Sequence, residues 1–286
     1  ALAAARRERS PAAAMAAVAA CGARVIALGD PDYPPLLAET ATPPFVLFAR
    51  GDAAPLPAPA VAVVGTRAAT AYGRDATWRI VGPLARQGIV IVSGLALGID
   101  AAAHAAALEA GGPTVAVVAG GIDGVYPPRH AALHARIVEL GCVVSEVAPG
   151  IAPTAGRFPA RNRIIAGLAL ATIVVEAGAK SGARITAACA ADEGRDVLAV
   201  PGPITAAQSQ GTHRLIADGA SLATSADDVL AVLDLARRAD DAAVRSDLPD
   251  DPAETRLSAA LSTVPADADD LGRRTGLDAA AVGRAL

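Results

Sequence analysis

The chain of 286 residues is 53% hydrophobic and carries a formal net charge of −4. This length and composition allow a large buried core and exclude a disordered protein. The acidic balance gives no global signal for nucleic acid, so a site for a polyanion would have to be a local basic patch.

The cysteines and the apolar segments bear on the cellular compartment. The three cysteines lack metal-ligand spacing, and their odd number fits unpaired thiols in a reducing cytoplasm. We find no charged-then-apolar leader, and the apolar runs are too short and too often broken by glycine to cross a bilayer. We therefore expect a cytoplasmic protein that has no metal site and does not contact membrane.

Two segments precede the main domain. Residues 1–22 are rich in alanine and have a helical pattern, and they resemble the tail of something longer. Residues 23–60 contain the proline-punctuated runs DPDYPPLL and PPFVLFARGD and end in a stiff linker, AAPLPAP. We expect residues 23–60 to form an extended segment and linker that pack on the core as strand and loop.

From Val61 onward, short apolar runs alternate with segments of helical spacing. The expected strands are Val61–Val64, Ile89–Val92, Thr114–Ala119, Val143–Val144, Thr172–Val175 and Val197–Val200. The expected helices are Arg74–Gln87, Ile99–Ala110, His130–Leu140, Asn162–Leu170 and Ala183–Glu193. This alternation predicts an α/β fold over residues 61–239, with a doubly wound, mainly parallel sheet and helices on both faces.

The pattern changes after Gly211, where the remaining segments are all helical. Residues 240–253 are rich in aspartate and predict a solvated acidic linker. Residues 254–286 show helix, turn, helix, turn and a third helix that the chain end cuts short, and DLGRRTGLDAAAV has helix-turn-helix spacing. A small helical cap or a dimerisation piece fits this pattern equally well.

Small-residue turns follow several of the expected strands. They are Gly65-Thr66-Arg67, Ser93-Gly94, Gly120-Gly121 and the turn Gly178–Gly182, which carries Lys180 and Ser181. The carboxyl ends of parallel strands meet at one edge of a sheet, and glycine there lets backbone N–H groups approach a phosphate closely. The turns therefore predict an anion site at that edge. The alternative is that each glycine only makes a tight turn between strand and helix.

The run Arg157–Arg163, RFPARNR, is the most basic stretch of this domain, and we expect it to precede a helix. Between residues 148 and 190, five basic side chains accompany a single carboxylate, that of Glu176. An aromatic side chain can stack a base while arginines follow the phosphate backbone, so arginines around Phe158 suit single-stranded nucleic acid. Alternatively, Phe158 fills the core while the arginines cap helices or pair with Glu146 and Glu176.

Common catalytic and cofactor motifs are missing from the sequence. The first turn, GTRAATAYG, is not a dinucleotide-binding fingerprint, and no Gly-Lys pair forms a Walker A loop. No Gly-x-Ser-x-Gly elbow occurs either. We therefore predict no catalytic residue and no cofactor.

Six segments, in this order, resemble the DNA-processing protein A (DprA/Smf) family: SGLALGIDAAAHAAAL, GGIDGVYPPRH, SEVAPG, FPARNRIIAGLA, VVEAGAKSGARITAACAADEGRDVLAVPG and GTHRLIADGA. The resemblance runs from about Arg24 to Leu230. It implies a Rossmann-like domain that binds single-stranded DNA without sequence preference, protects it and loads a RecA-type recombinase during natural transformation. It also implies a homodimer, with residues 211–235 near the interface, and no enzymatic activity.

The resemblance also implies the DNA-binding residues. They are Gly65, Thr66, Arg67, Ser93, Gly94, Arg157, Phe158, Arg161, Asn162, Arg163, Lys180 and Ser181. Asp100 and His104 are expected to be structural, and Glu176 to orient Arg161 or Asn162. By the same resemblance, residues 1–22 would be a remnant of an N-terminal helical domain and residues 254–286 a truncated, winged-helix-like piece.

Two other functions stay open at this point. Related Rossmann-like families hydrolyse nucleotides or cleave N-glycosidic bonds, typically with a PGGxGT loop, whereas this chain has PGPITAAQSQGT. The helix-turn-helix spacing would also suit a regulator that reads duplex DNA. The preferred substrate, whether a single strand, a duplex or a mononucleotide, distinguishes the three functions.

Overall fold

The computed structural model describes residues 11–233, 267–278 and 281–282. The chain divides into two compact units, residues 1–231 and 232–286, which are described separately below. The expected acidic linker, residues 240–253, lies outside the described residues. So do residues 1–10 of the alanine-rich segment and residues 254–266 of the C-terminal piece.

The first unit is built on one nine-stranded sheet in the order β1-β2-β6-β5-β4-β3-β7-β8-β9. The strands are β1 Ala23–Ala27, β2 Val46–Gly51, β3 Ala60–Val64, β4 Val90–Ser93, β5 Thr114–Val117, β6 Cys142–Ser145, β7 Ala171–Val174, β8 Asp196–Ala199 and β9 Ser221–Leu222. All neighbours from β6 to β9 pair in parallel, whereas β1 pairs with β2 and β2 with β6 in antiparallel fashion. The α/β fold with a mainly parallel sheet is confirmed, and the segment before Val61 adds two strands at its edge.

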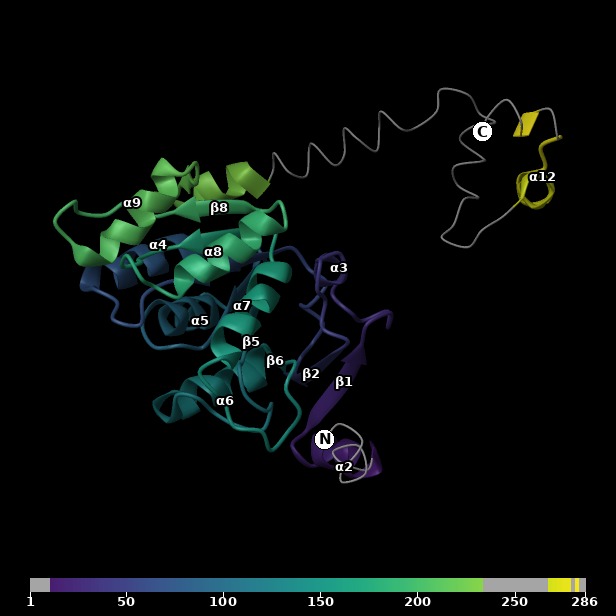
Figure 1. Ribbon diagram of the computed structural model, residues 1–286, viewed down its shortest axis with the longest axis horizontal. Helices are drawn as coiled ribbons and strands as arrows, with labels where there is room; N and C mark the ends of the chain where they lie inside the picture. Colours follow the sequence, from purple (N-terminus) through teal and green to yellow (C-terminus); the bar gives the residue numbers. More distant parts are fainter. Residues whose placement is uncertain (1–10, 234–266, 279–280, 283–286) are drawn as a thin grey trace. The chain divides into compact units, whose positions relative to one another are not determined.

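The helices of this unit follow the predicted alternation. They include α2 Pro11–Ala20, α3 Pro35–Ala38, α4 Ala71–Arg86, α5 Ile99–Glu109, α6 Ala131–Leu140, α7 Arg157–Gly167, α8 Ala183–Asp192 and α9 Gln210–Ala217, with 3-10 turns at Pro128–His130 and Ala207–Ser209. Residues 226–231 are helical as well. Figure 1 shows α7 and α8 side by side, and α5 packs against α4 and α6. None of the helices among the described residues is both long and apolar enough to cross a membrane.

The direction of the helical connections between the parallel strands determines where a crevice opens. Passing through α4, α5 and α6, the chain moves from β3 to β6 in one direction, whereas through α8 it moves from β7 to β8 in the opposite one. Right-handed connections therefore place α4, α5 and α6 on one face and α8 on the other. The strand order reverses between β3 and β7, and such a switch point opens a crevice at the carboxyl ends of the strands.

The five strands β3 to β7 are buried along their whole length. A parallel strand covered by helices on both faces has no solvent side, which explains why these segments are apolar throughout rather than alternating. These rigid central strands carry the loops at the crevice.

Helix α7 begins earlier than predicted. It covers Arg157–Gly167, so the run RFPARNR forms the first turns of the helix and not a segment before it. Pro159 is the third helical residue, and N–H groups in the first turn have no partner within a helix, so a proline costs little there. Phe158 and Arg161 are therefore held by helical geometry.

The second unit contains helix α12, Ala268–Thr275. The Asp267 carboxylate caps its start by accepting a hydrogen bond from the backbone N–H of Asp270 at 2.8 Å. Gly276 ends it with φ of 70°, a left-handed conformation that glycine adopts without strain. Leu271 and Val282 are buried, as expected for helices that pack around a turn.

Candidate nucleic-acid interface

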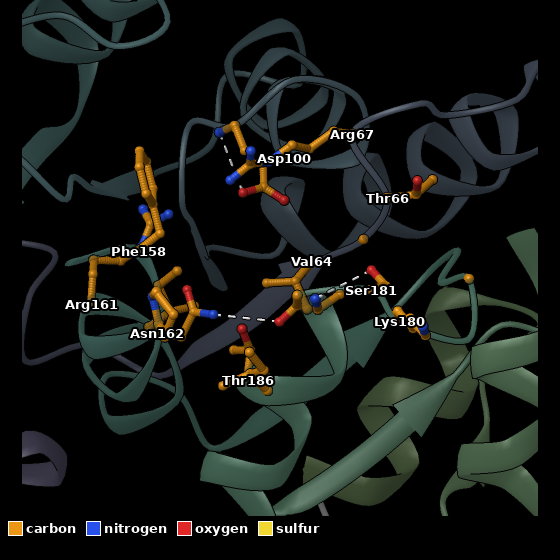
Figure 2. Close-up of a pocket in the computed structure, with 18 of the residues that line it drawn as sticks. Val64, Thr66, Arg67, Asp100, Phe158, Arg161, Asn162, Lys180, Ser181 and Thr186 are labelled. Atoms are coloured by element: carbon orange, nitrogen blue, oxygen red, sulfur yellow. Dashed lines mark hydrogen bonds between the residues drawn. The ribbon is translucent and has the colours of Figure 1, made fainter. Parts of the chain in front are cut away.

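A pocket of about 650 Å³ lies at the crevice between β3 and β7. Segments far apart in the sequence line it: the turn after β3, the start of α7, and the turn from β7 into α8 (Figure 2). Eight of the predicted site residues are among its lining residues: Gly65, Thr66, Arg67, Phe158, Arg161, Asn162, Lys180 and Ser181. The fold thus brings together most of the candidates chosen from sequence.

Phe158 contacts two other planar groups, the Arg67 guanidinium and the Tyr126 ring. The guanidinium carbon of Arg67 lies 5.3 Å from the centroid of the Phe158 ring, within the range of a cation–π contact. The Tyr126 ring is a second neighbour: its centroid lies 5.4 Å from that of Phe158, and the two ring planes are tilted by 49°. The ring is half-buried rather than lost in the core, so it can offer a stacking surface.

The basic groups line opposite walls of the pocket. In Figure 2, Phe158, Arg161 and Asn162 project from α7 on one side, whereas Lys180 and Ser181 lie across from them. The Asn162 amide also donates to the carbonyl of Gly182 at 3.4 Å, which connects the two walls.

Arg67 and Lys180 are both exposed. Within the described parts of the chain, neither of them forms an ion pair with a carboxylate. Both charges are therefore available to an anion.

Arg161 has a different position, because its side chain is buried beneath the pocket. Its Nη1 donates to the carbonyl oxygen of Gly94 at 2.7 Å and to that of Val117. Burial lowers its pKa to about 10, against the attraction of Asp100, so the guanidinium stays protonated at neutral pH. Arg161 therefore supplies positive charge to the floor of the pocket and supports the Gly94 turn from below.

Asp100 is buried at the start of α5 and also lines the pocket. Its carboxylate accepts hydrogen bonds from the backbone N–H groups of Gly94 at 3.2 Å and Ala96 at 3.4 Å. Burial raises its pKa, while Arg161 and these backbone N–H groups oppose the rise. Its main role is structural, as expected for an aspartate in the first turn of a helix.

The expected role of Glu176 in orienting Arg161 or Asn162 is wrong. Its carboxylate accepts hydrogen bonds from the backbone N–H of Thr70 at 2.9 Å and from the Thr70 hydroxyl at 2.5 Å. Its backbone carbonyl also accepts from the N–H of Thr66 at 2.7 Å. Glu176 thus fixes the loop between β3 and α4, where Thr70 is the N-cap.

Several backbone N–H groups expected to face a phosphate are engaged within the protein. That of Thr66 donates to Glu176, that of Gly94 to Asp100, and that of Gly121 to the carbonyl of Ile151 at 2.7 Å. The glycines of these turns thus allow close packing of the protein on itself. Contacts to an anion would therefore come mainly from side chains.

Four predicted residues do not line this pocket. Ser93 is fully buried, and its hydroxyl donates to a backbone carbonyl of β3 at 2.6 Å. Arg157 donates to a loop carbonyl at 2.7 Å, and Arg163 pairs with Glu146 at 2.6 Å, as the alternative interpretation of the arginines allowed. Gly94 lines an adjoining cavity of about 340 Å³ together with Phe158 and Tyr126.

The sequence reasoning did not name several other lining residues as site residues. Val64 lies on β3, Ala96 and Ala155 lie in loops, and Pro159, Ile165, Ala183, Ile185 and Thr186 lie on α7 and α8. Apolar and hydroxyl side chains at helical spacing look like core residues, so no sequence signal separated them from the interior. Among the described residues, no cluster of three or more His, Cys, Asp or Glu side chains could hold a metal ion.

Comparisons with known proteins identify the family of this chain. The sequence model of the family described as DNA recombination-mediator protein A matches residues 24–234, and that of the DprA winged helix domain matches residues 241–286. The chain is 50% identical over 192 residues to a DNA processing protein DprA of Mycobacterium tuberculosis, a match that covers 65% of this chain and 49% of the relative. It thus spans about half the length of that protein.

Solved structures show the same similarity. The X-ray structure of DNA processing protein A from Streptococcus pneumoniae superposes with a TM-score of 0.71 at 46% identity, over 73% of each chain. A solved structure of DNA processing protein A from Helicobacter pylori, studied for its single-stranded DNA binding mode, superposes with a TM-score of 0.67 at 29% identity, over 74% of this chain and 95% of the other. With a family model matched over most of its length, this chain belongs to the DNA recombination-mediator protein A family.

Proposed function

We propose that this chain binds single-stranded DNA, without sequence preference, in the pocket between β3 and β7. The observation that carries the proposal is the Arg67 guanidinium 5.3 Å above the half-buried Phe158 ring, in a pocket that Lys180 also lines. A base that stacks on an aromatic face, with its phosphates beside basic side chains, is the general arrangement for single strands. The single-strand binding noted for the Helicobacter pylori relative supports the same proposal.

In the proposed mechanism each group has a separate task. Phe158 offers its face to a base, Arg67 and Lys180 bind phosphates, and the hydroxyls of Thr66 and Ser181 can donate to phosphate oxygens. Arg161, which is buried under the pocket, adds positive charge to its floor. Since all of these groups recognise features shared by every nucleotide, binding depends on the strandedness of the DNA and little on its sequence.

We further propose that the bound strand is protected and passed to a RecA-type recombinase during natural transformation, and that the chain acts as a homodimer. Family membership supports this role, and two linked pockets would raise avidity for one strand through effective concentration. Light scattering in solution tests the dimer. A nucleation assay with recombinase and oligo-dT tests loading, and no acceleration of filament formation by the chain would contradict it.

We propose binding and not nucleotide hydrolysis because of how the carboxylates are used. Asp100 is the one carboxylate among the described lining residues, and it is buried and bonded to backbone amides. Glu176, the other candidate for acid–base chemistry, is bonded to Thr70. Neither carboxylate is free to act on a nucleotide in this pocket.

Fluorescence anisotropy of labelled oligo-dT, with its duplex as competitor, tests the proposal. We expect tighter binding of the single strand, and Phe158→Ala should weaken it by about 5-fold or more, since stacking contributes about 1–3 kcal/mol per base. Arg67→Ala should also lower the slope of log K against log salt by about 0.7, the value for one lost phosphate contact with a single strand.

Arg157→Ala is the matched control, because Arg157 is a basic residue next to Phe158 that does not line the pocket. Its oligo-dT affinity should stay close to that of the unmodified chain. Equal affinity for single strand and duplex, or no loss in both Arg67→Ala and Phe158→Ala, would overturn the proposed function.

A further inference from the structure

A second groove, of about 560 Å³, adjoins the first pocket on the face covered by α4, α5 and α6. Arg67 lines both cavities, so the groove and the pocket meet at this side chain. Its walls come from the start of α4 on one side and from the turn into α6 on the other. Apart from Arg67, the family resemblance and the sequence patterns gave no role to the residues of this groove.

One wall of the groove combines an aromatic and a basic side chain. Arg74 and Trp78 are four residues apart on α4 and so lie on the same face of the helix. Trp78 is 42% exposed, although tryptophan is a side chain that proteins usually bury. The Arg74 guanidinium donates to the carbonyl of Ala69 at 2.6 Å, which holds it beside the loop that carries Arg67.

The opposite wall carries two more nitrogen-containing side chains, Arg129 and His130. Arg129 is exposed, and the His130 ring is held at the edge of the groove by a hydrogen bond between Nδ1 and the carbonyl of Leu95 at 3.0 Å. Between the walls, Ala101 and Ala105 of α5 form the floor. Their small side chains keep the groove open.

The charge around the groove is positive. Its described lining residues include three arginines and no carboxylate. Two carboxylates of α4 and α5 are paired with other arginines, Asp75 with Arg79 at 2.6 Å and Glu109 with Arg136 at 3.8 Å. Asp100 of α5 is buried and accepts hydrogen bonds from backbone N–H groups. The groove thus places basic side chains around an exposed aromatic ring, as the first pocket does with Phe158.

We propose that this groove is a second binding site for the same DNA strand, which passes over Arg67 and stacks a base on Trp78. The inference rests on the proposed function, because the strand must first occupy the pocket at Phe158. Arg74 and Arg129 then bind phosphates on either side of the stacked base, so the strand follows a path from the crevice across α5.

The experiment uses the fact that Trp78 is the single tryptophan of the chain, so intrinsic tryptophan fluorescence reports on this groove alone. The probes are dT oligomers of about 4 and about 16 nucleotides, which span the usual range of single-strand site sizes. We expect the longer oligomer to quench Trp78 and the shorter one, held at Phe158, to leave its emission nearly unchanged.

Variants test the same groove by anisotropy. Trp78→Ala and Arg74→Ala should weaken binding of the longer oligomer by about 5-fold each and leave the shorter one unaffected, while Trp78→Phe keeps most of the affinity. Arg86→Ala is the matched control, since Arg86 is an exposed arginine in the last turn of α4 that lies outside the groove. Circular dichroism checks that each variant is folded.

The outcomes separate this inference from the proposed function. Suppose that the longer oligomer binds and that Phe158→Ala weakens its affinity. If it then does not quench Trp78, and neither Trp78→Ala nor Arg74→Ala lowers its affinity, the second site is wrong and the first stands. If no oligo-dT binds at all, the proposed function fails and the second site fails with it.

Discussion

The buried histidine of α5, His104, should make the first unit less stable in mild acid. Its side chain has no exposed surface, and its Nδ1 lies 2.7 Å from the Thr114 hydroxyl. That hydroxyl donates its proton to the Ile91 carbonyl at 2.7 Å, so it accepts from Nδ1, and His104 is the neutral Nδ1–H tautomer. Its Nε2 is buried without a partner among the described residues.

Burial, with smaller contributions from Arg161 and His130, lowers the pKa of His104 to about 3 from the ordinary value of 6.5. Between these values the unfolded chain binds a proton that the folded chain does not bind, so stability falls as the pH falls. At about 1.36 kcal/mol per pH unit, the loss between pH 7.5 and pH 5 is about 2 kcal/mol.

Urea unfolding followed by circular dichroism at pH 7.5, 6 and 5 measures this effect. The comparison is with His104→Asn, whose amide nitrogen can replace Nδ1 as the donor to Thr114 but does not titrate. The smaller side chain costs stability at every pH, so only the change with pH is compared. If both proteins lose the same stability between pH 7.5 and pH 5, the reasoning about His104 is refuted.

Three other variants test how the pocket is held. In Gly94→Ala the new Cβ would lie 2.6 Å from Nη1 of Arg161, and the crowding should destabilise the protein by about 1–3 kcal/mol in a thermal melt. Glu176→Gln replaces one of the two oxygens that accept hydrogen bonds from Thr70 by an NH2 group, which is a donor. We expect the free energy of unfolding in urea to fall by about 1.5–3 kcal/mol and oligo-dT binding to weaken. Unchanged stability would contradict the role of Glu176 in holding the loop. Arg157→Ala should change the free energy of oligo-dT binding by no more than about 0.5 kcal/mol, and a larger anisotropy change would extend the site beyond the pocket.

Much of the fold could be predicted because its signals are local. The runs that became β3, β4, β5, β6, β7 and β8 are apolar and bounded by glycine or proline, and their order alone predicts a parallel sheet. The same logic placed Arg67 and Lys180 at one edge, since both follow strands. The structure confirms the fold class and brings these two residues into one pocket.

The parts that could not be predicted depend on tertiary contacts. Ser93 looked like a turn residue because the apolar run ends before it, yet it is the last residue of β4 and bonds within the sheet. Glu176 was placed beside Arg161 by proximity in sequence to the basic run, whereas its partner Thr70 lies 106 residues away. Trp78 gave no signal at all, because only the folded chain shows that α4 leaves it exposed beside Arg67.

The anchoring of the loop between β3 and α4 by Glu176 has a consequence for the composition of the DNA. Because Glu176 already fixes the loop that carries Arg67, little of the entropy cost of binding falls on the protein, and most of it falls on the strand. A strand rich in adenine must break its own base stacking before it can place a base on Phe158, while a thymine strand has little stacking to lose. Within its general binding of single strands, the chain should therefore show a modest preference for flexible pyrimidine tracts over stiff purine tracts, which comes from the strand and not from recognition of a base edge.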